Sequence, residues 1–120
     1  MTKKERVINA IQFKDVDAVP SSFSLHFEKD KAFGDEAVKS HLDFFKSTDT
    51  DILKIMNENL VPCYGKINCA NDYKEVQKVS SNDSFFKDQI ELTKKIINKC
   101  EKDAFTIGTL HGITASAIHP

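Results

Sequence analysis

The sequence predicts an α/β protein built on a parallel sheet. Three short apolar runs, at residues 19–26, 52–58 and 105–111, each end in a polar cluster, and helix-like segments separate them. Strands that alternate with helices favour βαβ units, in which the strands are parallel. Ligands of such sheets bind beyond the carboxyl ends of the strands. Functional side chains are therefore expected where each run ends.

The first helix is predicted from about Lys3 to Phe13. Thr2 and Glu5 match a capping box, in which each side chain accepts a hydrogen bond from a free backbone N–H at the start of the helix. Its apolar stripe consists of Val7, Ile8 and Ile11. Pro20 favours extended geometry in the residue before it, which suits entry into a first strand over residues 19–26.

A second helix is predicted from about Asp35 to Lys46, and a second strand over Ile52–Met56. The apolar positions of the helix are Ala37, Val38, Leu42 and Phe45. Side chains alternate across a strand, so Lys54 should face away from its apolar neighbours, as an ion-pair partner rather than a catalytic amine. The polar segment 59–82 is long for a connection, and such loops are usually functional or disordered.

The third helix, from Asp83 to about Glu101, has the clearest pattern. Its main apolar row is Phe86, Ile90, Thr93 and Ile97, which Leu92 and Ile96 widen. A third strand follows over Phe105–Leu110, and residues 113–120 are compatible with the start of another helix.

Length and charge exclude several classes of protein. The 120 residues make one domain, and 17 basic against 18 acidic side chains provide no field for nucleic acid or an anionic membrane. No apolar run reaches the length of a membrane span or forms the core of a signal peptide, so a cytoplasmic location is expected. The three cysteines form no CxxC pair, which favours reduced thiols. Cys63 and Cys69 lack the spacing of a metal site, and Cys100 is expected to pack.

Several segments, taken in order, resemble the N-terminal portion of the uroporphyrinogen decarboxylase superfamily. They are residues 2–11, 17–20, 50–58, 60–62 and 106–112. This superfamily includes tetrapyrrole decarboxylases and corrinoid- or cobalamin-dependent methyltransferases. The resemblance covers essentially the whole chain but only about the first third of a family member. It implies the first three strand–helix units of a TIM (β/α)8 barrel, incomplete here, with the active site at the carboxyl ends of the strands.

The chain departs from the decarboxylases where they bind substrate carboxylates. Those enzymes carry an arginine-rich segment after the first strand, and arginine pairs bidentately with carboxylate. Here residues 22–30 contain no arginine, and Arg6 in the first helix is the sole one. The decarboxylases also place an aspartate after the second strand, and Glu58 lies at or beside that position.

The methyltransferase branch uses a zinc site formed by a His-x-Cys pair and a later cysteine in the distal half of the barrel. The matching region would lie beyond Pro120, so no cofactor is expected within this chain. Zinc is expected only in a complete barrel of the methyltransferase type.

Five residues at the strand ends are candidates for the site. Glu58 and Asn57 are the candidates for catalysis, because polar groups at the end of an apolar strand are costly unless they are satisfied or used. Glu58 would hydrogen-bond a protonated nitrogen or act as a general acid/base, and the alternative is a solvated carboxylate. His26, His111 and Met56 are the candidates for substrate binding, the alternative for the histidines being a structural hydrogen bond at the rim. The other two histidines, His41 and His119, are expected at the surface.

The resemblance implies an enzyme, with a lean toward the methyltransferase branch because the carboxylate-binding arginines are missing. The alternatives are uroporphyrinogen decarboxylation in porphyrin biosynthesis, and a non-catalytic fragment or small binding domain. The expected partners are a tetrapyrrole, a corrinoid protein or a small methyl donor, with no nucleic acid and no membrane. Unpaired sheet edges favour self-association or a homodimer, and negligible turnover by the isolated chain.

Overall fold

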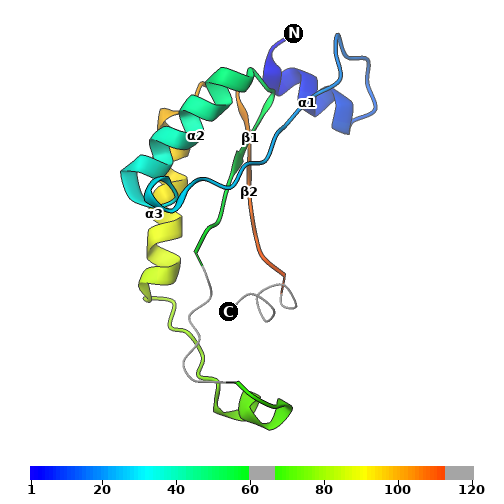
Figure 1. Ribbon diagram of the computed structural model, residues 1–120. Coiled ribbons are helices and arrows are strands. Elements are labelled where there is room, and N and C mark those ends of the chain that lie inside the picture. The colour runs from blue at the N-terminus through cyan, green and yellow to red at the C-terminus, as the bar shows by residue number, and fades with distance from the viewer. Residues whose placement is uncertain (60–66, 113–120) are drawn as a thin grey trace.

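The computed structural model describes residues 1–59 and 67–112, and it is a mixed α/β structure (Figure 1). The predictions for Cys63, His119 and a helix after residue 112 lie outside the described residues. In chain order the helices are α1 (Lys3–Ile11), α2 (Gly34–Thr48) and α3 (Ser84–Lys99), and the strands are β1 (Ile52–Ile55) and β2 (Phe105–Gly108). Two short 3-10 turns, η1 (Lys29–Lys31) and η2 (Ala70–Glu75), lie in the connections.

All three predicted helices form. The capping box at α1 is present, with Glu5 N–H donating to Thr2 Oγ1 and Thr2 N–H donating to Glu5. The helix ends at Ile11, two residues before the predicted end, because Phe13 adopts a left-handed φ of 57°. At α3, the Asp83 carboxylate accepts a hydrogen bond from the Phe85 N–H and caps the helix.

The two strands pair in parallel, as predicted, and form an open two-stranded sheet. Ile52 lies opposite Phe105, and Ile55 lies opposite Gly108. Leu53 and Ile55 point toward α2 and α3, which pack against each other along the same face. Lys54 faces away, as expected, and its Nζ donates to Ser24 Oγ at 3.1 Å. The predicted ion pair of Lys54 is not found among the described residues.

The predicted first strand over residues 19–26 is wrong, since this segment forms no strand. Pro20 has no N–H to donate, and the Ser21 carbonyl accepts hydrogen bonds from the N–H groups of both Asp51 and Ile52. The segment nevertheless runs beside β1 in the same direction. Its serines contact residues that are each 30 positions later, at Asp51, Ile52 and Lys54. The hydroxyls of Ser22 and Ser24 therefore help to hold this segment beside β1, where no ladder of backbone hydrogen bonds forms.

The core lies between the sheet and the two long helices. It consists of Ala37, Val38, Phe45, Leu53, Ile55, Leu92, Ile96 and Ala104, with Leu42 and Cys100 packed against it. The sequence analysis chose the wrong face of α3 as the main buried row. Leu92 and Ile96 are the buried residues, whereas Phe86, Ile90 and Ile97 are exposed. The reason is that the residues of α2 and β1 in the core pack against Leu92 and Ile96, which the sequence pattern placed beside the main row.

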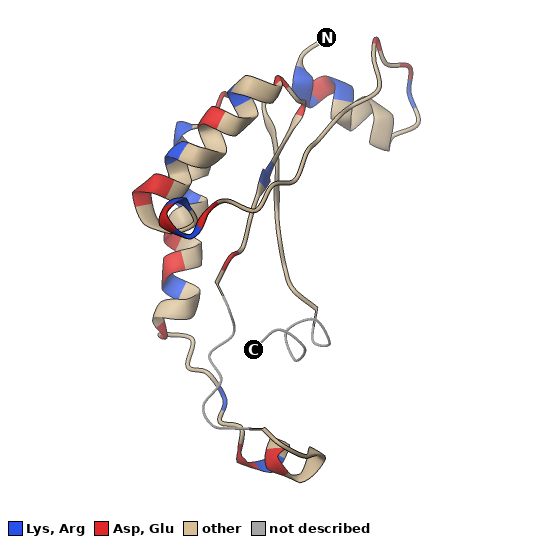
Figure 2. Ribbon diagram, viewed as in Figure 1, with Lys and Arg blue, Asp and Glu red and all other residues tan. Residues whose placement is uncertain are grey.

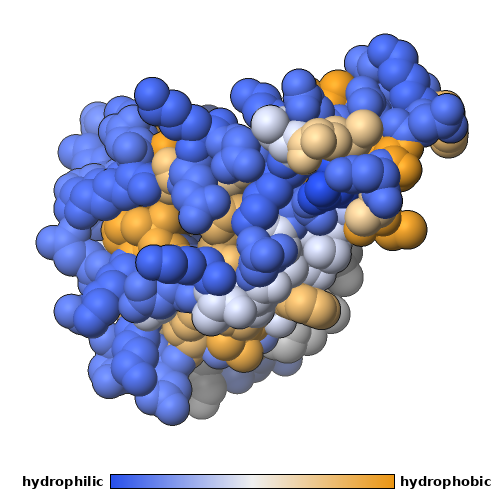
Figure 3. Space-filling model, turned by 90° about the horizontal axis from the view of Figure 1, so that it is seen from above, coloured by the Kyte–Doolittle hydropathy of each residue, from blue (hydrophilic) through white to orange (hydrophobic). Residues whose placement is uncertain are grey.

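Among the described residues, the side of the sheet that faces away from α2 and α3 is partly exposed. Phe105 and Ile107 alternate with the residues that face the helices, and Ile107 is exposed. Parallel sheets are usually covered on both faces. The radius of gyration of 17.5 Å also exceeds the roughly 14 Å of a compact chain of this length. Viewed from above, hydrophobic side chains reach the surface between hydrophilic ones (Figure 3).

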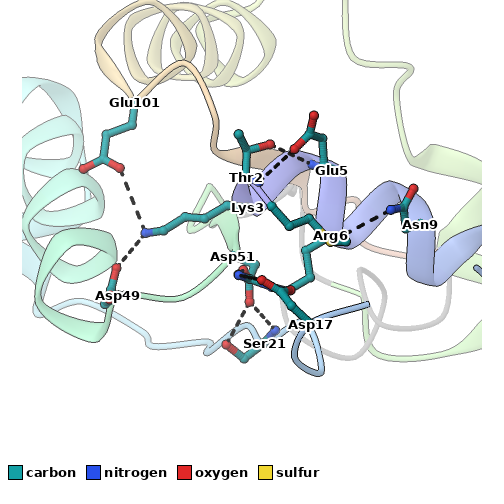
Figure 4. Close-up of polar contacts among 11 residues, drawn as sticks. Thr2, Lys3, Glu5, Arg6, Asn9, Asp17, Ser21, Asp49, Asp51 and Glu101 are labelled. Carbon is teal, nitrogen blue, oxygen red and sulfur yellow. Dashed lines mark hydrogen bonds and ion pairs between the residues drawn. The ribbon is translucent and has the colours of Figure 1, made fainter. Parts of the chain in front are cut away.

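An ion-pair network fixes α1 to the amino end of β1 (Figure 4). The Arg6 guanidinium bonds both carboxylate oxygens of Asp17 and one oxygen of Asp51, and the second Asp51 oxygen accepts from the Ser21 N–H at 2.9 Å. Beside Arg6, the pKa of Asp17 falls to about 2. Burial raises the pKa of Asp51, but the hydrogen bonds from Ser21 and Arg6 outweigh burial and hold it below its ordinary value. Lys3 adds ion pairs to Asp49 and Glu101.

Both α2 and α3 carry charged side chains of both signs (Figure 2). Lys95 on α3 pairs with Asp35 on α2 at 2.9 Å and with Glu91 one turn before it at 3.0 Å. These exposed pairs are worth little to stability, and they leave no broad field of one sign along the two helices. Within the described residues, none of the helices is long and apolar enough to cross a membrane.

Candidate functional site

Four of the predicted site residues contact one another in pairs at the carboxyl end of β1. His26 Nδ1 lies 2.9 Å from Glu58 Oε1, so the segment before η1 meets the residues that follow β1. His111 Nε2 lies 2.8 Å from the Asn57 carbonyl oxygen, so the residues after β2 meet the same edge. The polar residues that end the three apolar runs therefore gather at one rim of the sheet.

The hydrogen-bond partners assign the tautomers of these histidines. A carbonyl oxygen only accepts hydrogen bonds, so His111 carries its hydrogen on Nε2 and leaves Nδ1 as an acceptor. A carboxylate likewise only accepts, so Nδ1 of His26 carries a hydrogen. When neutral, His26 presents a lone pair on Nε2. The two histidines at the rim are thus held in opposite tautomers.

Two side chains that the sequence analysis did not select hold the end of β1 in place. His41 Nε2 accepts a hydrogen bond from the Met56 N–H at 2.9 Å, and Gln89 Nε2 donates to the Met56 carbonyl at 3.1 Å. Met56 itself is buried. Gln89 Oε1 also accepts from Asn59 Nδ2 at 2.8 Å. The backbone on either side of Asn57 and Glu58 is therefore fixed from α2 and from α3.

The prediction that His41 lies at the surface was wrong, because its exposed fraction is 3%. It lies four residues after the buried Ala37, whose carbonyl accepts its Nδ1–H at 2.6 Å. The ring of Phe27 packs against it edge to face at 4.8 Å. Burial lowers the pKa of His41 from the usual 6.5, against smaller opposing effects of the Ala37 carbonyl and the Glu58 charge. Helical spacing from Ala37 was the signal that could have placed His41 in the core, whereas no such signal marked Gln89.

The His41 contacts predict that stability falls in mild acid. A protonated Nε2 would face the Met56 N–H, donor against donor, so the folded state favours the neutral ring. The lowered pKa means that the unfolded chain binds a proton below pH 6.5 that the folded chain does not bind. The contribution of His41 to the free energy of unfolding is therefore fully present above pH 6.5. It is lost as the pH falls toward the lower pKa of the folded state. Urea unfolding at about pH 7.5 and about pH 5.5 measures the difference.

His41→Gln removes the buried titrating ring and should flatten this pH dependence. Lys54, which lines the same pocket as His41, and Glu58, whose charge acts on His41, are not altered in the variant. The matched control is His111→Gln, which changes an exposed ring and should leave most of the pH dependence in place. An equal pH dependence in wild type and His41→Gln would contradict this assignment.

A pocket of about 330 Å³ opens beside His111. Three polar residues, Asn57, Gln89 and His111, line one part of it. The rest of the wall is apolar and consists of Phe85, Phe86, Ile90 and Leu110. The rings of Phe85 and Phe86 meet edge to face at 4.9 Å. An apolar wall with a few convergent polar groups is typical of small-molecule sites.

The arginine of the chain lies at the other end of the sheet. Asp51, which binds Arg6, directly precedes β1, whereas Glu58 follows it. Both Arg6 carboxylate contacts are internal, to Asp17 and Asp51. Arg6 is therefore not placed to bind carboxylates of a ligand at the rim.

Within residues 1–59 and 67–112, no group of three His, Cys, Asp or Glu side chains is arranged to hold a metal ion. Cys69 is exposed, and its Sγ donates to Asp72 Oδ1 at 3.4 Å. Cys100 packs against the core, as expected, and burial raises the pKa of its thiol.

Comparison with known proteins gives no relative for this chain: no family model, no curated protein and no solved structure matches it.

Proposed function

We propose that this chain forms the N-terminal portion of an enzyme of the uroporphyrinogen decarboxylase type and binds a small molecule at the carboxyl rim of its sheet. The observation that carries the proposal is the convergence of His26, Glu58, Asn57 and His111 at one end of parallel strands. This is the end at which ligands bind in α/β proteins. The pocket beside His111 supplies an apolar wall for such a ligand.

Within that superfamily the proposal leans to the corrinoid-dependent methyltransferase branch. A substrate with many carboxylates needs cationic partners at the rim, and arginine is the residue best suited to that task. The described residues of the rim are histidines, amides and one glutamate, while Arg6 is bound to Asp17 and Asp51 at the opposite end. An apolar wall fits a corrinoid or a small methyl donor better than it fits a polycarboxylate.

The test is a titration of the 120-residue protein with methylcobalamin and, separately, with uroporphyrin. Binding is monitored through changes in the amide chemical shifts in NMR spectra. Methylcobalamin should shift the amides of Asn57, Glu58 and His111. Uroporphyrin should bind at least about tenfold more weakly, since each missing charged hydrogen bond costs more than one factor of ten in affinity. Glu58→Ala should weaken methylcobalamin binding, and Glu28→Ala, which changes an exposed carboxylate elsewhere, should not.

Other outcomes would favour the alternatives. Tighter binding of uroporphyrin at the same amides, or formation of coproporphyrinogen from uroporphyrinogen, would overturn the methyltransferase lean in favour of decarboxylation. No binding of either compound, together with concentration-dependent association in the ultracentrifuge, would favour a non-catalytic unit. The exposed apolar residues Phe86, Ile90 and Ile107 are the observation behind that alternative.

A further inference from the structure

The pair formed by His26 and Glu58 has unequal exposure. The side chain of His26 is 80% exposed, whereas that of Glu58 is 20% exposed. A ligand at the rim would therefore reach the imidazole before it reached the carboxylate. The contact atom on the imidazole is Nδ1, so the ring edge that carries Nε2 is the one left for a ligand.

The segment that carries His26 is held to β1 by several contacts. Ser21 N–H donates to Asp51, Ser22 Oγ donates to the Ile52 carbonyl, and Lys54 Nζ donates to Ser24. On the other side of the pair, the backbone before Glu58 is held through Met56 by His41 and Gln89. Both partners are thus delivered by fixed backbone, which a proton-transfer site requires.

The geometry points to His26 as the proton acceptor of the rim, with Glu58 as its positioning residue, whereas the sequence alone predicts Glu58 as the catalytic acid/base and His26 as a substrate-binding residue. Glu58 holds the hydrogen on Nδ1, so the Nε2 lone pair is available as a base. Among the described residues, no hydrogen bond is made to Nε2 of His26. A carboxylate that orients an imidazole in this way is a recurrent device for general-base catalysis.

The step is a proton transfer. The Nε2 lone pair takes the proton of an acidic O–H, N–H or S–H group of a substrate, which leaves as the corresponding anion. The imidazolium that forms keeps its Nδ1–H on Glu58, whose negative charge stabilises the new positive charge. This inference rests on the proposed function for the existence of a substrate at the rim. Its own test requires no ligand.

The first measurement is the tautomer of each histidine ring, from ¹⁵N chemical shifts at a pH where the rings are neutral. His26 should be mainly the Nδ1–H tautomer and His111 mainly the Nε2–H tautomer, so the protein contains its own control. Glu58→Ala should return His26 to the Nε2–H preference of free histidine and leave His111 unchanged. Glu58→Gln keeps an acceptor oxygen and should retain the Nδ1–H form.

The second measurement is the rate of carbethoxylation of His26 by diethyl pyrocarbonate at neutral pH, mapped by mass spectrometry. Glu58→Ala should lower this rate about fivefold, the effect of losing one exposed charge-assisted hydrogen bond. Glu28→Ala, whose carboxylate pairs with Lys31, is the matched control and should not change it. The rate at His111 in the same sample shows that the variant is folded at the rim.

A wild-type His26 in the Nε2–H form would overturn the inference, because its reactive lone pair would then lie on the nitrogen that faces Glu58. An unchanged tautomer and rate in Glu58→Ala would overturn the positioning role of Glu58. Neither result would count against ligand binding at the rim, because binding is measured separately, from the amide shifts of Asn57 and His111. If methylcobalamin did not bind, the proposed function would fail, and the tautomer measurements would still test the roles of His26 and Glu58.

Discussion

Asp51→Asn should destabilise the protein by about 2–4 kcal/mol, the cost of breaking a buried charged contact and leaving hydrogen bonds unmade. The side chain of Asp51 is only 6% exposed, and both of its oxygens accept hydrogen bonds, one from Arg6 and one from Ser21. An asparagine amide has one acceptor oxygen. Its NH₂ group must therefore face one of these donors, donor against donor. Urea unfolding of the wild type and the variant measures the loss.

Asp49→Asn is the matched control for this substitution. It makes the same chemical change two residues earlier, where the side chain is 87% exposed and pairs with Lys3. Asparagine also tolerates the left-handed φ of 48° at this position. We expect little change in the unfolding midpoint. Equal losses in the two variants would mean that the Arg6 network does not hold the amino end of β1.

Ile96→Ala should cost about 2–5 kcal/mol, the range for removing a large aliphatic side chain from a packed core. Ile96 is fully buried and belongs to the cluster that joins α2, β1 and α3. Truncation leaves a cavity behind β1, the strand that carries Asn57 and Glu58 to the rim. Chemical denaturation gives the free energy, and the amide shifts of the rim residues report whether the strand end moves.

Ile97→Ala removes the same atoms from the next residue of α3, which is 49% exposed. Its cost should stay below about 1 kcal/mol, as for most substitutions outside the core. Comparing the two variants shows which face of α3 is buried, because the sequence pattern placed Ile97 in the main apolar row. A larger loss for Ile97→Ala than for Ile96→Ala would contradict the packing described above.

Helix positions were predictable from the sequence because they depend on local signals. Thr2, Glu5 and Asp83 cap helices through neighbouring backbone groups, so their roles follow from spacing alone. The buried face of α3 was harder to predict. Its apolar residues cover more than one row, and only the position of α2 decides that Ile96 rather than Ile97 is buried.

The candidate site was predictable in part for a similar reason. Parallel strands bring their carboxyl ends together, so residues at the ends of the runs meet even though the first run forms no strand. The contacts of His41 and Gln89 with Met56 were not predictable, because they join residues 15 and 33 positions apart across helix–sheet packing. The roles inferred for His26 and Glu58 depend on which ring nitrogen faces the carboxylate, and spacing in the sequence carries no information about that.

Residues 21–26 reach the rim without joining the sheet. Ser21, Ser22 and Ser24 hold this segment to Asp51, Ile52 and Lys54, whereas β2 is paired with β1 through backbone hydrogen bonds. The place of His26 at the rim thus depends on particular side chains upstream of it. Substitution of Ser22 and Ser24 by alanine should therefore displace His26 while the pairing of β1 with β2 is kept.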